Sequence, residues 1–599
     1  VLTTLAAFLP LMLLPGILGK FMRVIPLVVS LSLIISLVEA FWMMPAHMLA
    51  LRLDLTQKGS RLQPWRLRFL RKFRHAYARL LLRVLSRPRL YLALFLMPLV
   101  AAVAIVATGV LRMDFFAADP FPVFYLNVEM ASGTDLSRSL ATTRQVEERA
   151  MSVLRPGELR ASVAYAGQMM TDTEPLFGKK YGQVMFSLEP DEAKRRPVEE
   201  IITAMREAVS GMPGPERLQF LKLSGGPPVT KPISIKVRGD DFDTLLPAAK
   251  ALEEILGRMP EVHDIGNDFA NGLGEVTLRL NDDAVLRAGL QAGQVVRMIR
   301  LFGDGEVVSE FQHNGEKMAV RVMGSDRPLQ GVDDLLRLPV AVNRGESVPL
   351  STLTLAEVRR SMEMIHHYNY RRTITVEAEL DKSRLDIVAA NNRVRQAWQE
   401  VRHQYPEVSL DFSGILDDIE ESMDHITTLF IFGVGLMAMI LGAQFVSYGQ
   451  PLLILTTVPI AFTGVVFGLL LAGHPLSLYT LYGVVALSGI AVNSSIVLIS
   501  AANDRMAEGM GPVPAAIFAA RRRLVPILIT TLTTMAGLMS LATGLAGSSL
   551  MWGPVATAIV WGLGFSTTLT LFLMPLLYIT FRRRAYSRAE ATTRGVSPR

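Results

Sequence analysis

The stretch YTLYGVVALSGIAVNSSIVLIS, residues Tyr479 to Ser500, is apolar for about 22 residues, which is long enough for a helix to cross a bilayer. Its middle nevertheless carries the polar residues Asn493, Ser494 and Ser495. Polar side chains at mid-membrane are unfavourable unless they find partners inside a bundle or line a wet pathway. Any one of these residues fits simple helix packing equally well. As a cluster they predict a polar track through the core of a transporter.

The composition combines features of membrane and soluble proteins. Half of the 599 residues are hydrophobic and 19% are charged, which predicts a membrane block joined to a large water-exposed block. The chain contains no cysteine, so disulfides and thiolate metal sites are excluded.

Eight segments have the length and hydropathy of membrane spans. They are Val1–Gly19, Val24–Ala50, Leu90–Leu111, Ile426–Val446, Pro451–Gly473, Leu478–Ser500, Pro526–Leu545 and Val555–Phe581. The net charge of +7 is concentrated beside them: residues 51–89 hold twelve Lys and Arg against one acid, and two further basic clusters lie at Arg521–Arg523 and Arg582–Arg584. This pattern argues against nucleic-acid binding. The three clusters agree on one orientation, with the basic segments in the cytoplasm and the soluble block outside.

The basic segment 51–89 also contains Trp65, Phe69, Phe73 and several leucines. Aromatic and cationic residues mixed in this way predict an amphipathic helix that lies on the cytoplasmic face of the membrane. A solvated linker is the alternative.

Residues from Asp114 to about Ile415 form the soluble block. Strand-like runs alternate with amphipathic helices, which predicts α+β subdomains built from βαβ-type units. The predicted strands are Pro122–Met130, Ser162–Ala166, Gln183–Leu188, Ile233–Val237 and Glu275–Leu280; the predicted helices are Asp135–Leu154, Val198–Ser210, Phe242–Arg258 and Ile387–Gln404.

The beginning of the chain repeats its end. Thr3-Thr4-Leu5 matches Thr530-Thr531-Leu532, Pro26 matches Pro554, and Met44-Pro45 matches Met574-Pro575, at offsets of 527, 528 and 530. Matches in one order at nearly one spacing indicate a duplication. Because the second copy needs about 440 residues to reach its Thr-Thr-Leu, the repeat predicts a similar length of chain before Val1.

Met169, Met170, Phe177 and Tyr181 are predicted to lie on a loop between two strands. Exposed methionine and aromatic side chains suit loose binding of varied apolar ligands. Core packing and copper or silver ligation by thioether sulfur are the alternatives. No nucleophile–base arrangement or HExxH motif is present, so we expect neither an enzyme nor a cofactor.

The membrane spans offer few groups that titrate. Glu39 is embedded near the cytoplasmic end of its span, where helix packing or snorkelling is the expected role, and none of the last five spans has a carboxylate at its centre. Gly464 and Gly468 form a GxxxG motif that favours close helix packing.

Three segments carry a resemblance to a known family. AQFVSYGQPLLILTTVPIAFTGVV (443–466), ALSGIAVNSSIVLI (486–499) and RRRLVPILITTLTTMAGLMSLATG (521–544) make the chain resemble the resistance–nodulation–division (RND) efflux permeases of the AcrB-like type, as their C-terminal portion. The resemblance implies an α-helical membrane bundle of eight spans with a periplasmic α+β domain of ferredoxin-like subdomains. It also implies a bacterial inner-membrane homotrimer, with a periplasmic adaptor and an outer-membrane channel as partners, driven by proton influx.

The resemblance implies a division of the chain. Residues 1–50 are the last two spans of a first repeat, 51–89 a cytoplasmic linker, 90–111 a span, 112–230 a porter subdomain, 231–365 a docking-type and second porter region, 366–415 the end of that porter subdomain, 416–581 a five-helix block and 582–599 a basic cytoplasmic tail.

It also implies roles for single residues. Asn493 stands where many members have a relay lysine, with Arg523 and Thr530 at the arginine and threonine positions, so Asn493, Ser494, Arg523 and Thr530 are the expected coupling residues. An asparagine cannot supply the charge of a lysine, so the relay differs in detail. We expect export of hydrophobic or amphiphilic compounds. Export of heavy-metal ions or lipids, or a membrane-anchored protein-export or assembly component, are the alternatives.

Overall fold

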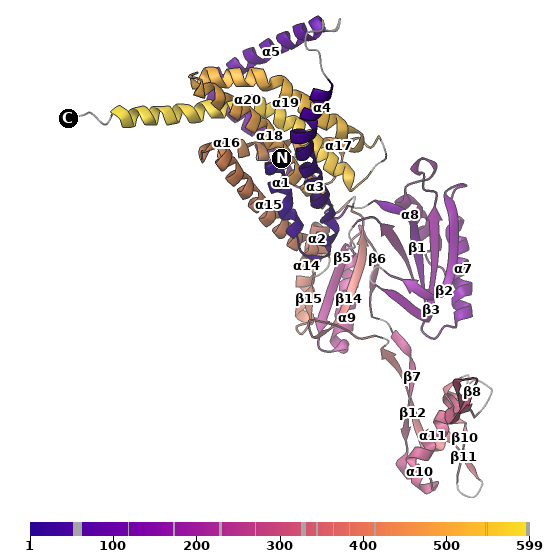
Figure 1. Cartoon of the computed structure of the whole chain (residues 1–599). Helices are drawn as coiled ribbons and strands as arrows, with labels where there is room; N and C mark the ends of the chain where they lie inside the picture. Colours follow the sequence, from indigo (N-terminus) through magenta and orange to yellow (C-terminus); the bar gives the residue numbers. More distant parts are fainter. Residues whose placement is uncertain are drawn as a thin grey trace.

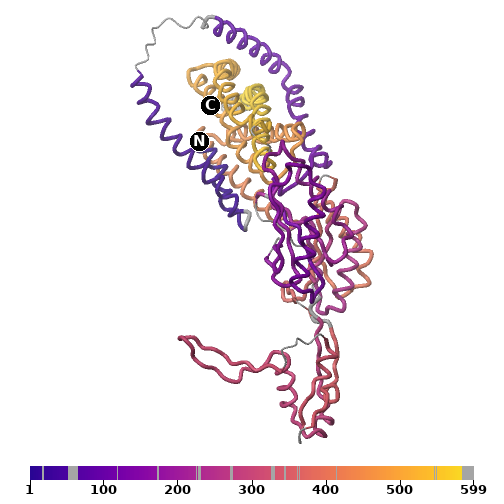
Figure 2. Tube along the Cα trace, turned by 90° about the vertical axis from the view of Figure 1, so that its right-hand side faces the viewer, coloured from indigo at the N-terminus to yellow at the C-terminus, as the bar shows by residue number. Residues whose placement is uncertain are grey.

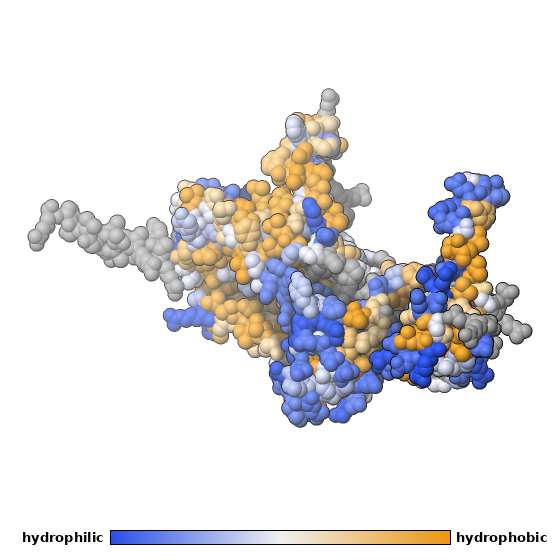
Figure 3. Space-filling view, turned by 90° about the horizontal axis from the view of Figure 1, so that it is seen from below, coloured by the Kyte–Doolittle hydropathy of each residue, from blue (hydrophilic) through white to orange (hydrophobic). Residues whose placement is uncertain are grey.

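The computed structural model describes residues 1–51, 63–117, 119–171, 174–226, 231–269, 271–324, 331–342, 346–362, 364–382, 384–412, 415–545, 547 and 549–594. A helical bundle forms one end of the molecule, two sheet subdomains follow it, and a narrow extension carries the smallest part at the far end (Figure 1). The hydrophobic surface gathers over the bundle and the hydrophilic surface over the sheets (Figure 3). The described residues contain seven helices that are long and apolar enough to cross a membrane.

The bundle is built from both ends of the chain. Its elements are α1 (Leu2–Phe8), η1 (Leu9–Leu13), α2 (Gly16–Met22), α3 (Val24–Val38), η2 (Glu39–Met43), α4 (Met44–Ala50), α5 (Gln63–Ser86), α6 (Pro88–Ala107), α15 (Ile415–Phe445), α16 (Gly449–Leu455), α17 (Thr457–Ala472), α18 (Leu478–Ala507), α19 (Pro512–Ala542) and α20 (Trp552–Arg594). The start of the basic segment, residues 52–62, and the last residues of the tail, 595–599, lie outside the described residues.

The first of the eight predicted spans differs from the prediction. Instead of one helix over Val1–Gly19, the structure has a shorter apolar helix over Leu2–Leu13 and then a break. Leu14 and Pro15 are extended, with ψ angles of 124° and 179°. The cause is Pro15, because the residue before a proline is disfavoured in the helical region.

Small residues bring the bundle helices close together. Gly464 and Gly468 of α17 are buried against α20, and a Cβ at Gly464 would lie 2.6 Å from the Cβ of Phe565. Gly489 of α18 similarly faces α1, where Thr4 donates a hydrogen bond to the Gly489 carbonyl at 3.2 Å. The close packing expected of the GxxxG motif is therefore present.

The first sheet subdomain is β1 (Pro120–Met130), α7 (Leu136–Met151), β2 (Leu159–Met170), β3 (Pro175–Leu188), α8 (Val198–Val209) and β4 (Pro215–Ser224). The strands pair antiparallel in the order β2-β3-β1-β4. Alternate residues of β1, among them Leu126 and Val128, pack with Ile201 and Met205 of α8 in one apolar core. Val146 and Ala150 of α7 belong to the same core, so both described helices of this subdomain cover one face of the sheet.

The second sheet subdomain repeats this element order. It consists of β5 (Ile233–Gly239), α9 (Phe242–Gly257), β6 (Val262–Asn267), β13 (His366–Tyr368), β14 (Arg371–Leu380), α14 (Ile387–Val401) and β15 (Ser409–Asp411). β6 pairs with β14, β14 with β5 and β5 with β15, all antiparallel. The strand order is thus the same in both subdomains, with β6 and β14 in the places of β2 and β3.

The distal part is inserted at one connection of the second sheet. β7 (Asn271–Leu280) leaves after β6 and β12 (Thr354–Met362) returns before β13, as a two-stranded antiparallel ribbon. The ribbon carries α10 (Asp282–Arg287), α11 (Ala292–Gly303), β8 (Glu306–His313), β9 (Glu316–Val322), α12 (Val332–Leu336), β10 (Pro339–Ala341), β11 (Ser347–Pro349) and α13 (Leu350–Leu353). Figure 2 shows this part projecting away from the sheets.

Polar contacts join the soluble block to the bundle, and two of them lie close to the first strand. Met113 forms a parallel bridge with Leu476, in the connection between α17 and α18. Asp119, just before β1, accepts a hydrogen bond of 2.7 Å from the Ser549 hydroxyl and another from the backbone of Leu550. These contacts couple the position of the sheets to the N-terminal ends of α18 and α20.

A buried ion pair makes the first subdomain sensitive to acid. Glu158, after α7, accepts two hydrogen bonds of 2.8 Å from Arg196, before α8. These bonds lower the pKa of Glu158 to about 2, well below the value of about 4.3 in an unfolded chain. The stabilisation is therefore complete above about pH 4.3 and is lost as the pH falls towards 2.

We expect Glu158→Gln to flatten the pH dependence of the melting temperature between pH 5 and pH 2. The control is Glu148→Gln on the exposed side of α7, which should leave the wild-type slope. An unchanged slope in Glu158→Gln would show that other carboxylates cause the acid sensitivity.

Candidate functional site

A cavity of about 450 Å³ lies between the two sheet subdomains. Its walls are the helix-free faces of both sheets, because side chains alternate along a strand. Asn127 and Glu129 of β1 line the cavity, whereas Leu126 and Val128 between them enter the helix-covered core. In the second sheet Thr375 and Glu377 of β14 line it in the same way. The repeated fold thus places two like faces opposite one another.

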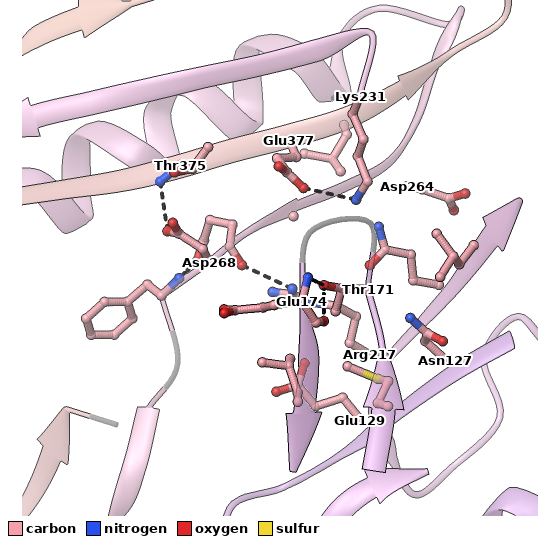
Figure 4. Close-up of a pocket in the computed structure, with 18 of the residues that line it drawn as sticks. Asn127, Glu129, Thr171, Glu174, Arg217, Lys231, Asp264, Asp268, Thr375 and Glu377 are labelled. Carbon is pink, nitrogen blue, oxygen red and sulfur yellow. Dashed lines mark hydrogen bonds and ion pairs between the residues drawn. The ribbon is translucent and has the colours of Figure 1, made fainter. Parts of the chain in front are cut away.

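The cavity lining is both apolar and charged. Its apolar side chains are Met169, Leu176, Tyr181, Leu218, Phe220, Leu221, Ile265, Phe269 and Met364. Its charged side chains include Glu129, Glu174, Arg217, Lys231 and Glu377, which Figure 4 shows around the same space. Lys231 and Glu377 form an ion pair of 3.1 Å, so part of the charge is already neutralised. Such a lining suits an organic molecule with an apolar body and a polar group.

Asp268 lies at the second sheet's side of the cavity. Its Oδ1 accepts a hydrogen bond of 2.7 Å from the backbone N–H of Thr375. Burial raises the pKa of Asp268, and the bond from Thr375 opposes this effect only in part. This carboxyl group therefore takes up a proton at a higher pH than an exposed aspartate.

Two side chains of the first subdomain hold the second one across the cavity. Arg206 of α8 binds Asp264 of β6 through both carboxylate oxygens, at 3.2 and 2.7 Å. Arg217 of β4 donates to the carbonyl of Asn267 at 3.1 Å. Asp264 has a φ of 52°, a conformation that is uncommon for residues other than glycine. We call the Arg206–Asp264 pair the clasp.

The structure divides the four predicted substrate residues into two pairs. Met169 and Tyr181 are buried and line the cavity. Met170 and Phe177 are 48% and 70% exposed and lie outside its lining. The predicted loop is wrong, because β2 continues to Met170 and β3 begins at Pro175, and residues 172–173 lie outside the described residues. In a strand, neighbours such as Met169 and Met170 face opposite sides.

A buried polar network holds the base of this hairpin. Gln183 of β3 donates to Asn127 at 2.5 Å and to the carbonyl of Met170 at 3.0 Å. The Gln183 side-chain oxygen accepts from the Tyr165 hydroxyl and, at 3.3 Å, from the Met170 backbone N–H. The network fixes the strand that presents Met169 to the cavity.

We expect Gln183→Leu to destabilise the β2–β3 hairpin by about 2–4 kcal/mol, because Asn127 and Tyr165 lose buried partners. Hydrogen–deuterium exchange should show faster exchange in residues 159–188 than in the wild type. The matched control is Gln145→Leu, an exposed position on α7. Equal protection in Gln183→Leu and wild type would contradict a structural role for the network.

The four predicted coupling residues are not joined in the structure. Asn493 of α18 and Thr530 of α19 are exposed on the bundle, and Ser494 and Arg523 are half-buried. Thr530 donates to the carbonyl of Ile527 in its own helix, at 2.9 Å. No hydrogen bond or ion pair within the described residues connects any two of the four.

Their neighbours in sequence face the bundle interior instead. Ser495 is fully buried, and its hydroxyl has no hydrogen-bond partner in the described part of the chain. Thr531 is buried and lies 3.2 Å from the Thr567 hydroxyl of α20. One residue along a helix turns the side chain by about 100°. At these two positions the buried polar side chains are therefore Ser495 and Thr531, and not Ser494 and Thr530.

A further polar cluster lies at one end of the bundle and was not predicted. Asn503 of α18 exchanges hydrogen bonds with Gln450 of α16, the shorter at 2.9 Å. The Asn503 side-chain oxygen also accepts from Tyr578 at 2.7 Å and from Arg582 at 3.4 Å, both on α20. Gln450, Asn503 and the α20 pair come from three segments separated by 53 and 75 residues, so no local pattern marks the cluster.

Few side chains in the described part of the chain are candidates for binding a metal ion. Among the described residues, no group of three or more His, Asp or Glu side chains is placed to hold a metal ion. His366 lines the cavity, as does Met364, whereas His367 is exposed on the neighbouring position of β13. The two histidines thus alternate in exposure, as expected for a strand.

Comparison with known proteins gives a consistent result. The model of the AcrB/AcrD/AcrF family matches residues 1–582. The chain is 26% identical to the nickel and cobalt resistance protein CnrA of Cupriavidus metallidurans, over 98% of this chain and 54% of that protein. It is 24% identical to the multidrug resistance protein MdtC of Photorhabdus laumondii, over 98% and 56%. The chain therefore spans about half the length of these curated relatives.

A solved structure supports the fold independently. The crystal structure of a heavy metal efflux pump superposes with a TM-score of 0.78 at 22% identity, and the match covers 97% of this chain and 58% of the pump. The arrangement of apolar helices and sheet subdomains is thus one already observed in an efflux protein.

Proposed function

The chain belongs to the AcrB/AcrD/AcrF family of RND efflux permeases, and from this premise we propose that it exports hydrophobic or amphiphilic organic compounds. We assign it to the bacterial inner membrane, with the sheet subdomains in the periplasm. The exported compound binds in the cavity between the two sheets. The chain acts as a transporter and not as an enzyme.

The main support for this proposal is the cavity between the two sheet subdomains. Its volume of about 450 Å³ falls within the range of small-molecule sites and greatly exceeds that of a metal ion. Met169, Tyr181 and Phe220 offer apolar and aromatic surface to a ligand body. Charged side chains of the same lining, such as Glu174 and Arg217, offer partners to an ionic group on the same ligand.

Export of a heavy-metal ion is the second candidate. Met169, Met364 and His366 line the same cavity, and thioether and imidazole groups are ligands of soft metal ions. Nickel and cobalt resistance is the named role of one relative and heavy-metal efflux that of the similar structure. The two candidates use the same cavity but different atoms of Met169.

Ligand binding to the purified chain tests the proposal. We expect a fluorescent amphiphilic cation such as ethidium to bind, and Met169→Ala to weaken this binding by about tenfold through lost apolar contact. The matched control is Met170→Ala, the exposed neighbour, which should change the affinity less than twofold. Calorimetric titration with Ni²⁺, Co²⁺ and Cu⁺ provides the second arm.

Each outcome has a consequence. Metal binding that depends on Met169, without dye binding, would replace the first candidate by the second. Equal effects of the two alanine variants would place the binding site outside the cavity.

We further propose that proton influx drives the cycle and that the protein acts as a homotrimer with a periplasmic adaptor and an outer-membrane channel. The two sheet subdomains, which share one strand order of the ferredoxin-like kind, serve as porter subdomains, and the part beyond β7 and β12 serves for docking. Asn493, Ser494, Arg523 and Thr530 remain the proposed coupling residues. Because Asn493 and Thr530 are exposed on the described bundle, they are positioned to contact further membrane helices.

A further inference from the structure

The N-terminal half of α5 exposes an aromatic stripe. Trp65, Phe69 and Phe73 follow one another at intervals of four residues and are 68%, 56% and 40% exposed. Their rings stack with centroid distances of 5.9 Å and 6.3 Å. Residues four apart lie on the same face of a helix. The three rings therefore form one continuous apolar surface, called here the aromatic stripe.

The C-terminal half of α5 is anchored on the bundle. Tyr77, Leu81 and Val84 are buried, and the Tyr77 hydroxyl donates to the carbonyl of Leu571 on α20 at 2.6 Å. The Tyr77 ring also packs against Phe572, with the ring centroids 5.3 Å apart. The helix is thus held at one half only, and its other half extends past the bundle with the aromatic stripe uncovered.

The flanks of the stripe are strongly cationic. The helix Gln63–Ser86 contains seven Lys and Arg residues and no Asp or Glu; the seven are Arg66, Arg68, Arg71, Lys72, Arg74, Arg79 and Arg83. None of the ion pairs formed within the described residues involves them. The Arg74 Nε is buried and lacks a hydrogen-bond partner there. A surface with this charge attracts anionic partners.

The position of α5 indicates where such partners come from. The helix starts at the end of the bundle farthest from the sheet subdomains (Figures 1 and 2). It leads directly into α6, a helix long and apolar enough to cross a membrane. The aromatic stripe therefore lies at the level where the membrane-spanning helices end, which is the level of lipid headgroups.

We propose that α5 is a binding site for anionic phospholipids of the membrane surface. The aromatic stripe enters the boundary between headgroups and acyl chains, where amphipathic aromatic rings are favoured. The flanking arginines bind lipid phosphates, because a guanidinium group offers paired donors to phosphate oxygens. The lipid is a bound partner and not the exported compound, so its binding can be tested without any transport assay.

Fluorescence quenching of Trp65 tests this site in the intact chain. The chain has five tryptophans, so the contribution of Trp65 is the difference between wild type and Trp65→Phe. The protein is placed in nanodiscs of phosphatidylcholine alone, or of phosphatidylcholine with 30% phosphatidylglycerol, each with a fraction of lipids brominated near the glycerol end. We expect quenching of the Trp65 signal to be at least twofold stronger in the anionic discs.

Charge variants show whether the cations select the lipid. Replacing Arg66, Arg68, Arg71 and Lys72 by Gln should abolish the difference between the two disc compositions. The control makes the same change in charge in the sheet subdomains, by replacing Arg144, Arg160, Lys250 and Arg258 by Gln. This control should retain the difference in quenching between the two disc compositions. Trp398→Phe, a buried change in α14, shows whether the quenching is specific to Trp65.

Three outcomes would overturn the proposal. Equal quenching in both disc types would overturn selection of anionic lipid, and no quenching in either would place the aromatic stripe away from the bilayer. Short RNA provides a further test. If short RNA bound the chain at concentrations too low for phosphatidylglycerol-rich vesicles to bind it, and also released the Trp65 quenching, the cations would belong to a nucleic-acid site. That result would overturn the proposal.

Discussion

Replacing Gly464 by leucine is expected to destabilise the bundle strongly. A Cβ at this position would already lie 2.7 Å from the carbonyl oxygen of Trp561 and 2.9 Å from the Cα of Gly562. Both are backbone atoms, so no side-chain rotation relieves the clash. α17 and α20 must then separate along their length, which costs about 3 kcal/mol or more. We expect a large loss of monodisperse protein in detergent and a fall in melting temperature.

The control uses the same substitution where space is available. Gly537 of α19 is exposed, and a Cβ there would meet no atom within 4 Å. Gly537→Leu should therefore express and melt like the wild type. If Gly464→Leu behaved like Gly537→Leu, the close approach of α17 and α20 would be wrong. Gly464→Ala should give an intermediate result, since only the Cβ must be accommodated.

Loss of the clasp is the second change with a large expected effect. Arg206→Met removes the cation and leaves the part-buried Asp264 without its bidentate partner. Loss of hydrogen bonds to a charged group of this kind costs about 1.5–3 kcal/mol. Because the clasp joins α8 of one subdomain to β6 of the other, we expect the loss to appear as a wider range of distances between the two sheets.

Spin labels can measure this distance directly. The chain has no cysteine, so Glu148→Cys on α7 and Glu254→Cys on α9 provide a unique pair of exposed sites. Electron–electron double resonance should show one narrow distance in the wild-type background and a broad distribution with Arg206→Met.

The control for the clasp is an ion pair within one subdomain. Lys222 and Glu199 are 2.9 Å apart, but the Glu199 side chain is 59% exposed. Lys222→Met should cost less than about 1 kcal/mol and leave the distance distribution narrow. A narrow distribution with Arg206→Met as well would show that Arg217 and the packing between the sheets suffice to hold the cavity closed.

Much of the fold can be predicted from local patterns. The predicted strand Ile233–Val237 lies within β5, and the predicted helix Val198–Ser210 matches α8 to within a residue. Periodicity finds these elements because each buries one face. The hairpin of β2 and β3 is longer than predicted because Gly167 and Gly178, which have positive φ, are accommodated within the strands instead of ending them.

The residues of the cavity and of the clasp are harder to predict from the sequence. Met169 and Tyr181 were predicted, but the residues opposite them, such as Glu377 and Asp268, follow from pairing of strands more than 100 residues apart. The clasp has no sequence signal, since neither Arg206 nor Asp264 belongs to a motif. In the bundle the composition predicts which helices carry polar groups. It does not predict which side of α18 faces the interior, where Ser495 is buried and Asn493, two residues earlier, is exposed.

The insertion of the distal part into the second sheet has a consequence for how this architecture varies. The ribbon of β7 and β12 leaves and returns at the connection that, in the first sheet, is the plain hairpin between β2 and β3. A hairpin connection can lengthen without disturbing the strands on either side, since only its two ends are constrained. The distal part is therefore an exchangeable module. Its length and sequence can change while the two sheets and the cavity between them keep their arrangement.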